Sequence, residues 1–163
     1  MGAAGAVLGW ACALAAFGAL GWGALVDARE RRIPNAAVTA VALAALVQMT
    51  LALALPEVAV GAYGSMGLAD APSRLGWGVG SLLALSLGEA LWRRARGTHG
   101  MGAGDIKLIG ALALWLGPFI VAALTLACAA GAVVALVRRQ RTFAFGPYLA
   151  LSGGVLMVAL LLM

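Results

Sequence analysis

The stretch Gly100-Met101-Gly102-Ala103-Gly104-Asp105-Ile106-Lys107 brings three glycines and an aspartate to the start of a long apolar run. A charged side chain inside a membrane-spanning segment costs about 2.5–3.5 kcal/mol on insertion scales. Glycines let the backbone approach a neighbour closely, and they permit turns with positive φ. The stretch therefore raises the question of whether Asp105 has a chemical partner elsewhere in the chain.

The rest of the chain has the composition of an integral membrane protein. Of its 163 residues, 64% are hydrophobic and 10% are charged, with a mean hydropathy of +1.03. Soluble domains are about 45–50% apolar and about 25% charged. We expect residues 1–163 to form a single all-α domain in a lipid bilayer, without a soluble domain. The net charge of +5 then reflects membrane topology and not nucleic-acid binding.

The apolar runs predict a bundle of six transmembrane helices. These runs are Ala6–Val26, Val38–Leu55, Leu75–Trp92, the two halves of Ile106–Val137, and Phe145–Leu162. Each half of the fourth run is short for a bilayer about 30 Å thick, so its helices start inside the glycine loop or the membrane is thinned there. Pro56–Ser73 is predicted to be the one sizeable loop. Gly76 and Gly80 have a spacing that allows another helix to approach closely.

Charge distribution decides how the fourth run is divided. Two crossings with a tight turn at Gly117-Pro118 place all the basic segments on one side of the membrane, as the positive-inside rule favours. Only Arg74 then lies on the other side, with both chain termini. We expect the basic side to face the cytoplasm. Its ten cations are Arg29, Arg31, Arg32, Arg93, Arg94, Arg96, Lys107, Arg138, Arg139 and Arg141.

Two aspartates fall at the same predicted depth on this side, Asp27 at the end of the first span and Asp105 at the start of the fourth. A pair of carboxylates, one ionised and one protonated, is the minimum apparatus of an aspartyl protease. In the other interpretation they are interfacial charges, paired with Arg29 and Lys107. Spacing alone leaves both interpretations open.

Four motifs carry a resemblance to a known family. The segment from Asp27 to Asn35 has an aspartate, then basic residues, then Ile-Pro-Asn, and Gly102–Leu108 reads G-x-G-D-x-K-L. Trp115-Leu116-Gly117 and Phe145-Gly146-Pro147 follow in the same order. Together they resemble the type IV prepilin peptidases, and the resemblance covers nearly the whole chain.

The resemblance implies a membrane aspartyl protease with Asp27 and Asp105 as the catalytic pair, supported by Gly102, Gly104 and Lys107 of the active-site loop. We expect no metal and no cofactor. Its substrates would be prepilins or pseudopilins, in which a short basic leader ending in glycine precedes a hydrophobic helix. Cleavage would occur at the cytoplasmic membrane face.

Two departures from the family pattern stand out. Large bifunctional members carry an extra cytoplasmic domain and an N-methyltransferase activity, but the connection from Asp27 to Val38 is too short for such a domain. We therefore expect peptidase activity alone, as in the small peptidases of tight-adherence (Flp-type) pili. Ala144 stands where the family often has proline.

Alternative functions remain open at this point. The same aspartates would suit a small proton- or cation-coupled transporter, although transporter carboxylates usually lie near the bilayer midplane. A presenilin-like G-x-G-D protease is a third candidate, but there a tyrosine typically precedes the first aspartate, where this chain has Val26. Glu89 is expected either to pair with Arg93 or to contact the basic leader. His99 is expected to be a solvated loop residue and not a metal ligand.

Overall fold

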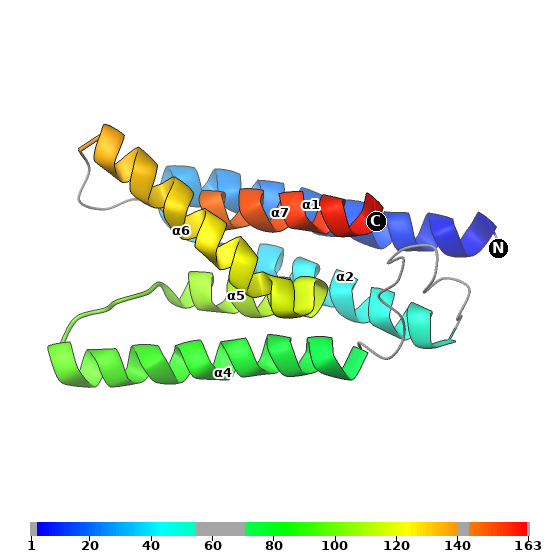
Figure 1. The fold of residues 1–163 in the computed structure, drawn as a ribbon, viewed down its shortest axis with the longest axis horizontal. Coiled ribbons are helices and arrows are strands. Elements are labelled where there is room, and N and C mark those ends of the chain that lie inside the picture. The colour runs from blue at the N-terminus through cyan, green and yellow to red at the C-terminus, as the bar shows by residue number, and fades with distance from the viewer. Residues whose placement is uncertain (1–2, 55–70, 140–143, 163) are drawn as a thin grey trace.

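The computed structural model describes residues 3–54, 71–139 and 144–162. This part of the chain is helical (Figure 1). Its elements are α1 (Ala3–Glu30), α2 (Asn35–Ala54), α4 (Ala71–Arg96), α5 (Ala103–Leu116), the short 3-10 helix η2 (Gly117–Phe119), α6 (Ile120–Val137) and α7 (Gly146–Leu162).

Several of these helices have the length and composition of membrane spans. Four segments in the described residues qualify: Val7–Glu30, Asn35–Ala54, Ala71–Arg96 and the combined Ala103–Val137, while Gly146–Leu161 is apolar but shorter. Large apolar side chains such as Leu14, Leu83 and Leu136 are exposed, which is typical of a surface that contacts lipid. The all-helical, multi-pass architecture is confirmed, whereas six separate crossings stay a prediction.

The chain reverses direction between α5 and α6 (Figure 1). Gly117 ends α5 with φ of 53°, a conformation that glycine adopts readily, and its N–H donates to the carbonyl of Ala113. Pro118 follows within η2, where its missing N–H costs nothing. The predicted turn at Gly117-Pro118 is therefore present. Because α5 begins at Ala103, the helix starts inside the glycine loop, one of the two arrangements expected.

Helix α5 lies at the centre of the bundle. Nine of its 14 residues are buried. It packs against α2, α4 and α7, while α1 packs against α2 and α7. Trp115 Nε1 donates a 3.0 Å hydrogen bond to the carbonyl of Val41, which ties α5 to α2 in the core. The helix that carries Asp105 is thus held firmly by its neighbours.

Helix α4 approaches α5 through glycines other than Gly76 and Gly80. A Cβ atom added at Gly76 or Gly80 would meet nothing within 4 Å, so the close approach that their spacing allows is not used in the described residues. The contact uses Gly78, where an added Cβ would overlap the Leu114 side chain, and Gly110, where it would lie 3.2 Å from Leu82 Cβ. Spacing alone did not identify which face of α4 meets its neighbour.

Some helix boundaries differ from the predicted spans. Helix α1 continues to Glu30, so Asp27 lies inside its last turn. Helix α4 already begins at Ala71, which shortens the predicted Pro56–Ser73 loop at its end. The remainder of that loop and Arg141 lie outside the described residues.

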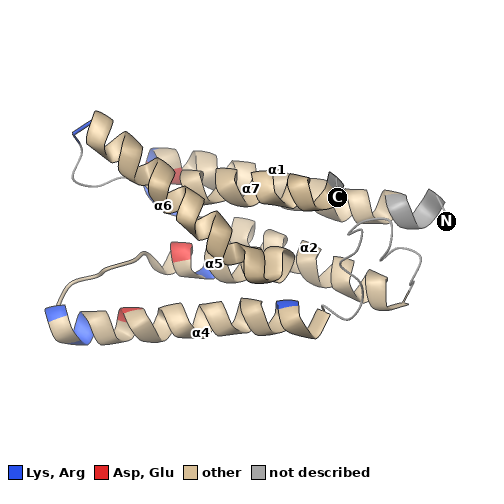
Figure 2. Ribbon diagram, viewed as in Figure 1, with Lys and Arg blue, Asp and Glu red and all other residues tan. Residues whose placement is uncertain are grey.

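Cations gather at one end of the bundle (Figure 2). This is the end where α1, α4 and α6 finish and α5 and α7 begin, whereas α1 starts and α7 finishes at the opposite end (Figure 1). Arg74 belongs to that opposite end, since its Cγ would lie 3.5 Å from a Cβ added at Gly117 in the α5–α6 turn. The arrangement matches the charge segregation expected from the sequence.

Candidate active site

Asp27 lies in the last turn of α1 and is buried, with 5% of its surface exposed. Its Oδ2 accepts a 3.0 Å hydrogen bond from the backbone N–H of Gly146, the first residue of α7. The N-terminus of a helix carries partial positive charge and favours an anion. A Cβ added at Gly146 would lie only 2.6 Å from Asp27 Oδ2, so glycine is what allows this approach.

Asp105 lies in the first turn of α5 and is half-buried. It accepts a hydrogen bond from the backbone N–H of Gly102, the N-cap residue of the same helix. An acidic side chain at the third helical position commonly reaches back in this way. A Cβ added at Gly102 would lie 2.9 Å from Asp105 Oδ2. Each aspartate is therefore oriented by a backbone N–H at the start of a helix.

Both aspartates lie at the end of the bundle where α1 finishes and α5 begins, and Asp105 is near enough to Asp27 to interact with its charge electrostatically. Ile33 packs between the helices that begin here. A Cβ added at Gly104 of α5 would lie 3.1 Å from Ile33 Cβ, and one added at Gly146 of α7 would lie 3.1 Å from Ile33 Cδ1. The Ile-Pro-Asn segment thus sets the spacing of the helix starts on either side of the carboxylates.

The two aspartates do not form the alternative ion pairs with neighbouring cations in the described residues. None of the ion pairs in the described residues joins Asp27 to Arg29 or Asp105 to Lys107. Lys107 Nζ instead donates a 3.1 Å hydrogen bond to Asn35 Oδ1, which links α5 to the start of α2. The Lys107 ammonium therefore binds the start of α2, and its supporting part in the active site stays a prediction.

The glycines of the loop serve close approach and not unusual backbone angles. Within the described residues, only Gly97 and Gly117 among the glycines have positive φ, at 68° and 53°. Of the two properties of glycine considered for Gly100, Gly102 and Gly104, close backbone approach is therefore the one that the structure uses. Their backbones lie too near other groups to leave room for a side chain.

The other polar residues near this end have different neighbours. Glu89 lies 3.4 Å from Arg93, as the i,i+4 spacing predicted, and 3.5 Å from His99 Nδ1. His99 itself is mostly exposed. In the described part of the chain, no three His, Cys, Asp or Glu side chains are grouped so that they could hold a metal ion.

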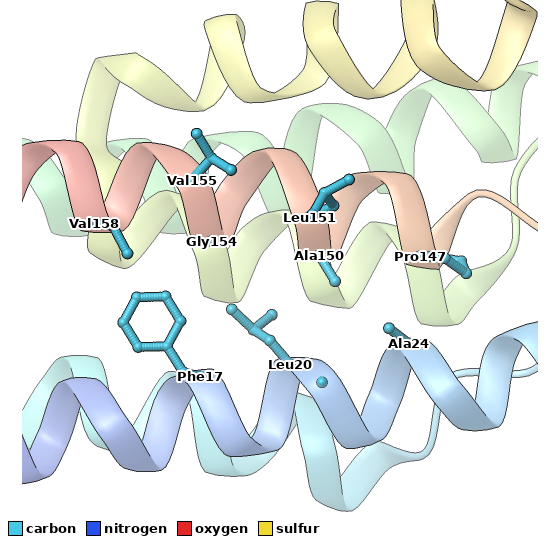
Figure 3. A pocket seen from close by; sticks show the side chains of 10 residues that line it. Phe17, Leu20, Ala24, Pro147, Ala150, Leu151, Gly154, Val155 and Val158 are labelled. Atoms are coloured by element: carbon cyan, nitrogen blue, oxygen red, sulfur yellow. The ribbon is translucent and has the colours of Figure 1, made fainter.

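An apolar groove of about 530 Å³ runs between α1 and α7 (Figure 3). Its lining ends at Ala24, three residues before Asp27 on α1, and at Pro147, next to the Gly146 that binds Asp27. Residues three apart share one face of a helix, so the groove opens beside the carboxylate. It is lined by Phe17, Leu20, Gly21, Ala24, Pro147, Ala150, Leu151, Gly154, Val155 and Val158.

Residues 13–136, which include both aspartates, match the type IV leader peptidase family. The chain belongs to this family. The resemblance inferred from the motifs is confirmed, and leader peptidase is the activity that the family name describes.

Curated relatives in the family share part of this sequence. A prepilin leader peptidase/N-methyltransferase from Neisseria gonorrhoeae is 40% identical over 74 residues, which are 43% of this chain and 26% of that protein. One from Xanthomonas campestris pv. campestris is 34% identical over 116 residues, or 63% of this chain and 39% of that protein. The chain thus spans well under half the length of these relatives. No solved structure matches it.

Proposed function

We propose that the protein is a membrane-embedded aspartic endopeptidase that removes the basic leader from prepilins or pseudopilins. The observation that carries the proposal is the interacting pair Asp27 and Asp105, each held by a backbone N–H at a helix start. Membership of the type IV leader peptidase family supports the substrate class.

The pair performs peptide hydrolysis by general acid–base catalysis. The ionised carboxylate takes a proton from water as the water oxygen bonds to the scissile carbonyl carbon. The protonated carboxyl donates its proton to the carbonyl oxygen, which gives a tetrahedral gem-diol. The C–N bond then breaks as the leaving nitrogen accepts a proton and one hydroxyl returns its proton to the pair. Mutual repulsion between the two carboxylates favours the state in which they share a single proton.

The proposed setting is a bacterial-type inner membrane that the chain crosses six times as one domain. Gathering of the cations at one end of the bundle supports a cytoplasmic active site, with both termini outside. A reporter enzyme fused to the C-terminus should then be active only outside the cytoplasm, and cytoplasmic activity would refute this topology.

Peptidase activity is proposed without N-methyltransferase activity. Only Arg31 to Pro34 connect α1 to α2, which leaves no room there for a further domain. Mass spectrometry of the cleaved substrate should show an unmethylated new N-terminus when S-adenosylmethionine is supplied.

Cleavage of a prepilin by the purified protein in liposomes tests the function. The expected result is a product shortened at the leader–helix junction, identified by intact mass. Proton or cation flux in the same liposomes, without any cleavage, would replace the proposal by the transporter alternative. The aspartates at helix ends favour cleavage, because a relay across the bilayer needs carboxylates at greater depth.

We propose that the groove between α1 and α7 is the binding site for the hydrophobic helix of the substrate. The groove is lined by apolar residues (Figure 3). Because it opens beside Asp27, a helix lying in it would present the peptide bond at its cytoplasmic end to the carboxylates. Lipid chains are the competing occupant.

A matched pair of substitutions distinguishes these occupants. An added Cβ at Gly21 or Gly18 meets nothing within 4 Å, but only Gly21 lines the groove. Gly21→Leu should raise the KM for prepilin about tenfold, equivalent to about 1.4 kcal/mol of lost binding, and Gly18→Leu should leave KM unchanged. Equal KM values for the two variants would show that the substrate helix does not bind in the groove, and lipid chains would then be its occupant.

A further inference from the structure

Helix α4 carries a buried carboxylate on an otherwise outward-facing helix. Glu89 is 8% exposed, and the other buried residues of α4 in the described structure are Arg74 and Gly78. Burial of a carboxylate is unfavourable unless hydrogen bonds and charge partners compensate for the lost water. The partners of Glu89 therefore indicate what its burial achieves.

The shortest contacts of Glu89 go to the backbone of the glycine loop. Its Oε2 accepts hydrogen bonds from the N–H groups of Met101, at 2.9 Å, and Gly100, at 3.2 Å. Its Oε1 faces Arg93 Nε at 3.4 Å and His99 Nδ1 at 3.5 Å. The pair with Arg93 is readable from the sequence, but the two bonds to the loop are not. Bonds between a carboxylate and N–H groups are among the stronger hydrogen bonds in proteins.

These bonds hold the loop against α4 just before the helix that carries Asp105. Met101 directly precedes Gly102, the N-cap residue that binds Asp105. A Cβ added at Gly100 would lie 3.0 Å from Trp92 Cδ1 and 3.2 Å from Glu89 Oε2, so the loop backbone packs directly on α4. A glycine-rich segment has many conformations when free, and Glu89 selects one of them.

We infer that Glu89 is a positioning residue for Asp105. Glu89 fixes the Gly100–Met101 backbone, that backbone fixes the N-cap of α5, and the N-cap orients the Asp105 carboxylate toward Asp27. The inference rests on the proposed peptidase function, because it assigns the loop a part in that reaction. Glu89 does not contact the reacting atoms.

Glu89→Ala tests this in the full-length protein reconstituted in liposomes. We expect the kcat for prepilin cleavage to fall about tenfold or more with KM unchanged, since misplacement of a reacting group by 1 Å can cost about 10²-fold. Hydrogen exchange in peptides that cover residues 97–102 should become faster. Glu89→Gln keeps an acceptor oxygen and should recover part of the kcat.

Two controls isolate the bonds to the loop. Arg93→Gln removes the ion pair but leaves both backbone hydrogen bonds, so kcat should stay near the wild-type value. Gly88→Ala adds a methyl group beside Glu89 where nothing lies within 4 Å, and it should change neither kcat nor exchange. If Glu89→Ala fails to fold, Gly100→Ala replaces it as the test. The added Cβ would lie 3.0 Å from Trp92 Cδ1, so the loop must move away from α4, and kcat should fall by the same amount.

The outcomes separate this inference from the function on which it rests. Wild-type kcat or unchanged exchange in a folded Glu89→Ala protein would overturn the inference. Cleavage that survives in Asp27→Asn and Asp105→Asn would overturn the proposed function, and with it the role of Glu89 in catalysis. Loss of cleavage in the aspartate variants together with normal cleavage in Glu89→Ala would refute the inference alone.

Discussion

Asp27→Asn and Asp105→Asn should each lower the rate of leader cleavage by about 10²–10⁴-fold, the range that general acid–base catalysis supplies. Asparagine has nearly the same shape as aspartate and keeps an oxygen that can accept the Gly146 or Gly102 N–H. It can neither take a proton from water nor donate one as a carboxylic acid. The cleavage rate should therefore fall because proton transfer is lost, while the fold is kept.

The control for this pair is an exposed carboxylate from the same end of the bundle. Glu30 pairs with Arg32 at 2.6 Å on the surface, and Glu30→Gln should cleave at the wild-type rate. The double aspartate variant should be little worse than either single variant, because residues that act as one unit are not additive. Initial rates from gel shift or intact mass, compared at equal amounts of folded protein, provide the measurement. Cleavage at the wild-type rate by either Asn variant would show that the substituted aspartate is not catalytic.

The position of both aspartates on one membrane side could be predicted from the sequence, because it depends on the basic residues and on the number of spans between the two aspartates. Basic residues mark one membrane side, and the two spans between Asp27 and Asp105 return the chain to that side. The structure has Asp27 and Asp105 at the same end and interacting. Neither inference required knowledge of which helices are neighbours.

The contacts that orient the aspartates were not readable in this way. The bond from Gly146 to Asp27 joins residues 119 positions apart and exists only because α7 packs on α1. The Phe-Gly-Pro motif marked Gly146 without assigning it a partner. Likewise, the bonds from Glu89 depend on the path of the loop over α4, which no helical periodicity encodes.

Glycine is a further case in which one residue type has two physical meanings. A glycine can be required for a positive φ or for a close neighbour, and the sequence alone does not show which of the two applies. Gly117 is the first kind, with φ of 53°, while Gly102 and Gly146 are the second kind, each against a carboxylate oxygen. The distinction matters because a substitution for glycine fails for a different reason in each case.

Gly146→Ala should lower the rate of leader cleavage by about 10²-fold, the cost of misplacing a reacting group by about 1 Å. The added Cβ would lie 2.6 Å from Asp27 Oδ2 and 3.0 Å from Asp27 Cγ, so the carboxylate must move or lose its hydrogen bond. Gly18→Ala, with nothing within 4 Å of the added Cβ, is the matched control and should cleave normally. Rates are compared at equal folded protein, with thermal unfolding measured in parallel.

The same substitution separates displacement of the carboxylate from general damage to the fold. Alanine has a higher helix propensity than glycine, so the start of α7 should not be weakened by the change itself. The added Cβ would also lie 3.1 Å from Ile33 Cδ1, an atom that Ile33→Val removes. If displacement of Asp27 causes the loss, adding Ile33→Val to Gly146→Ala should not restore cleavage. Full recovery in that double variant would show that crowding at Ile33, and not the Gly146–Asp27 contact, makes glycine necessary.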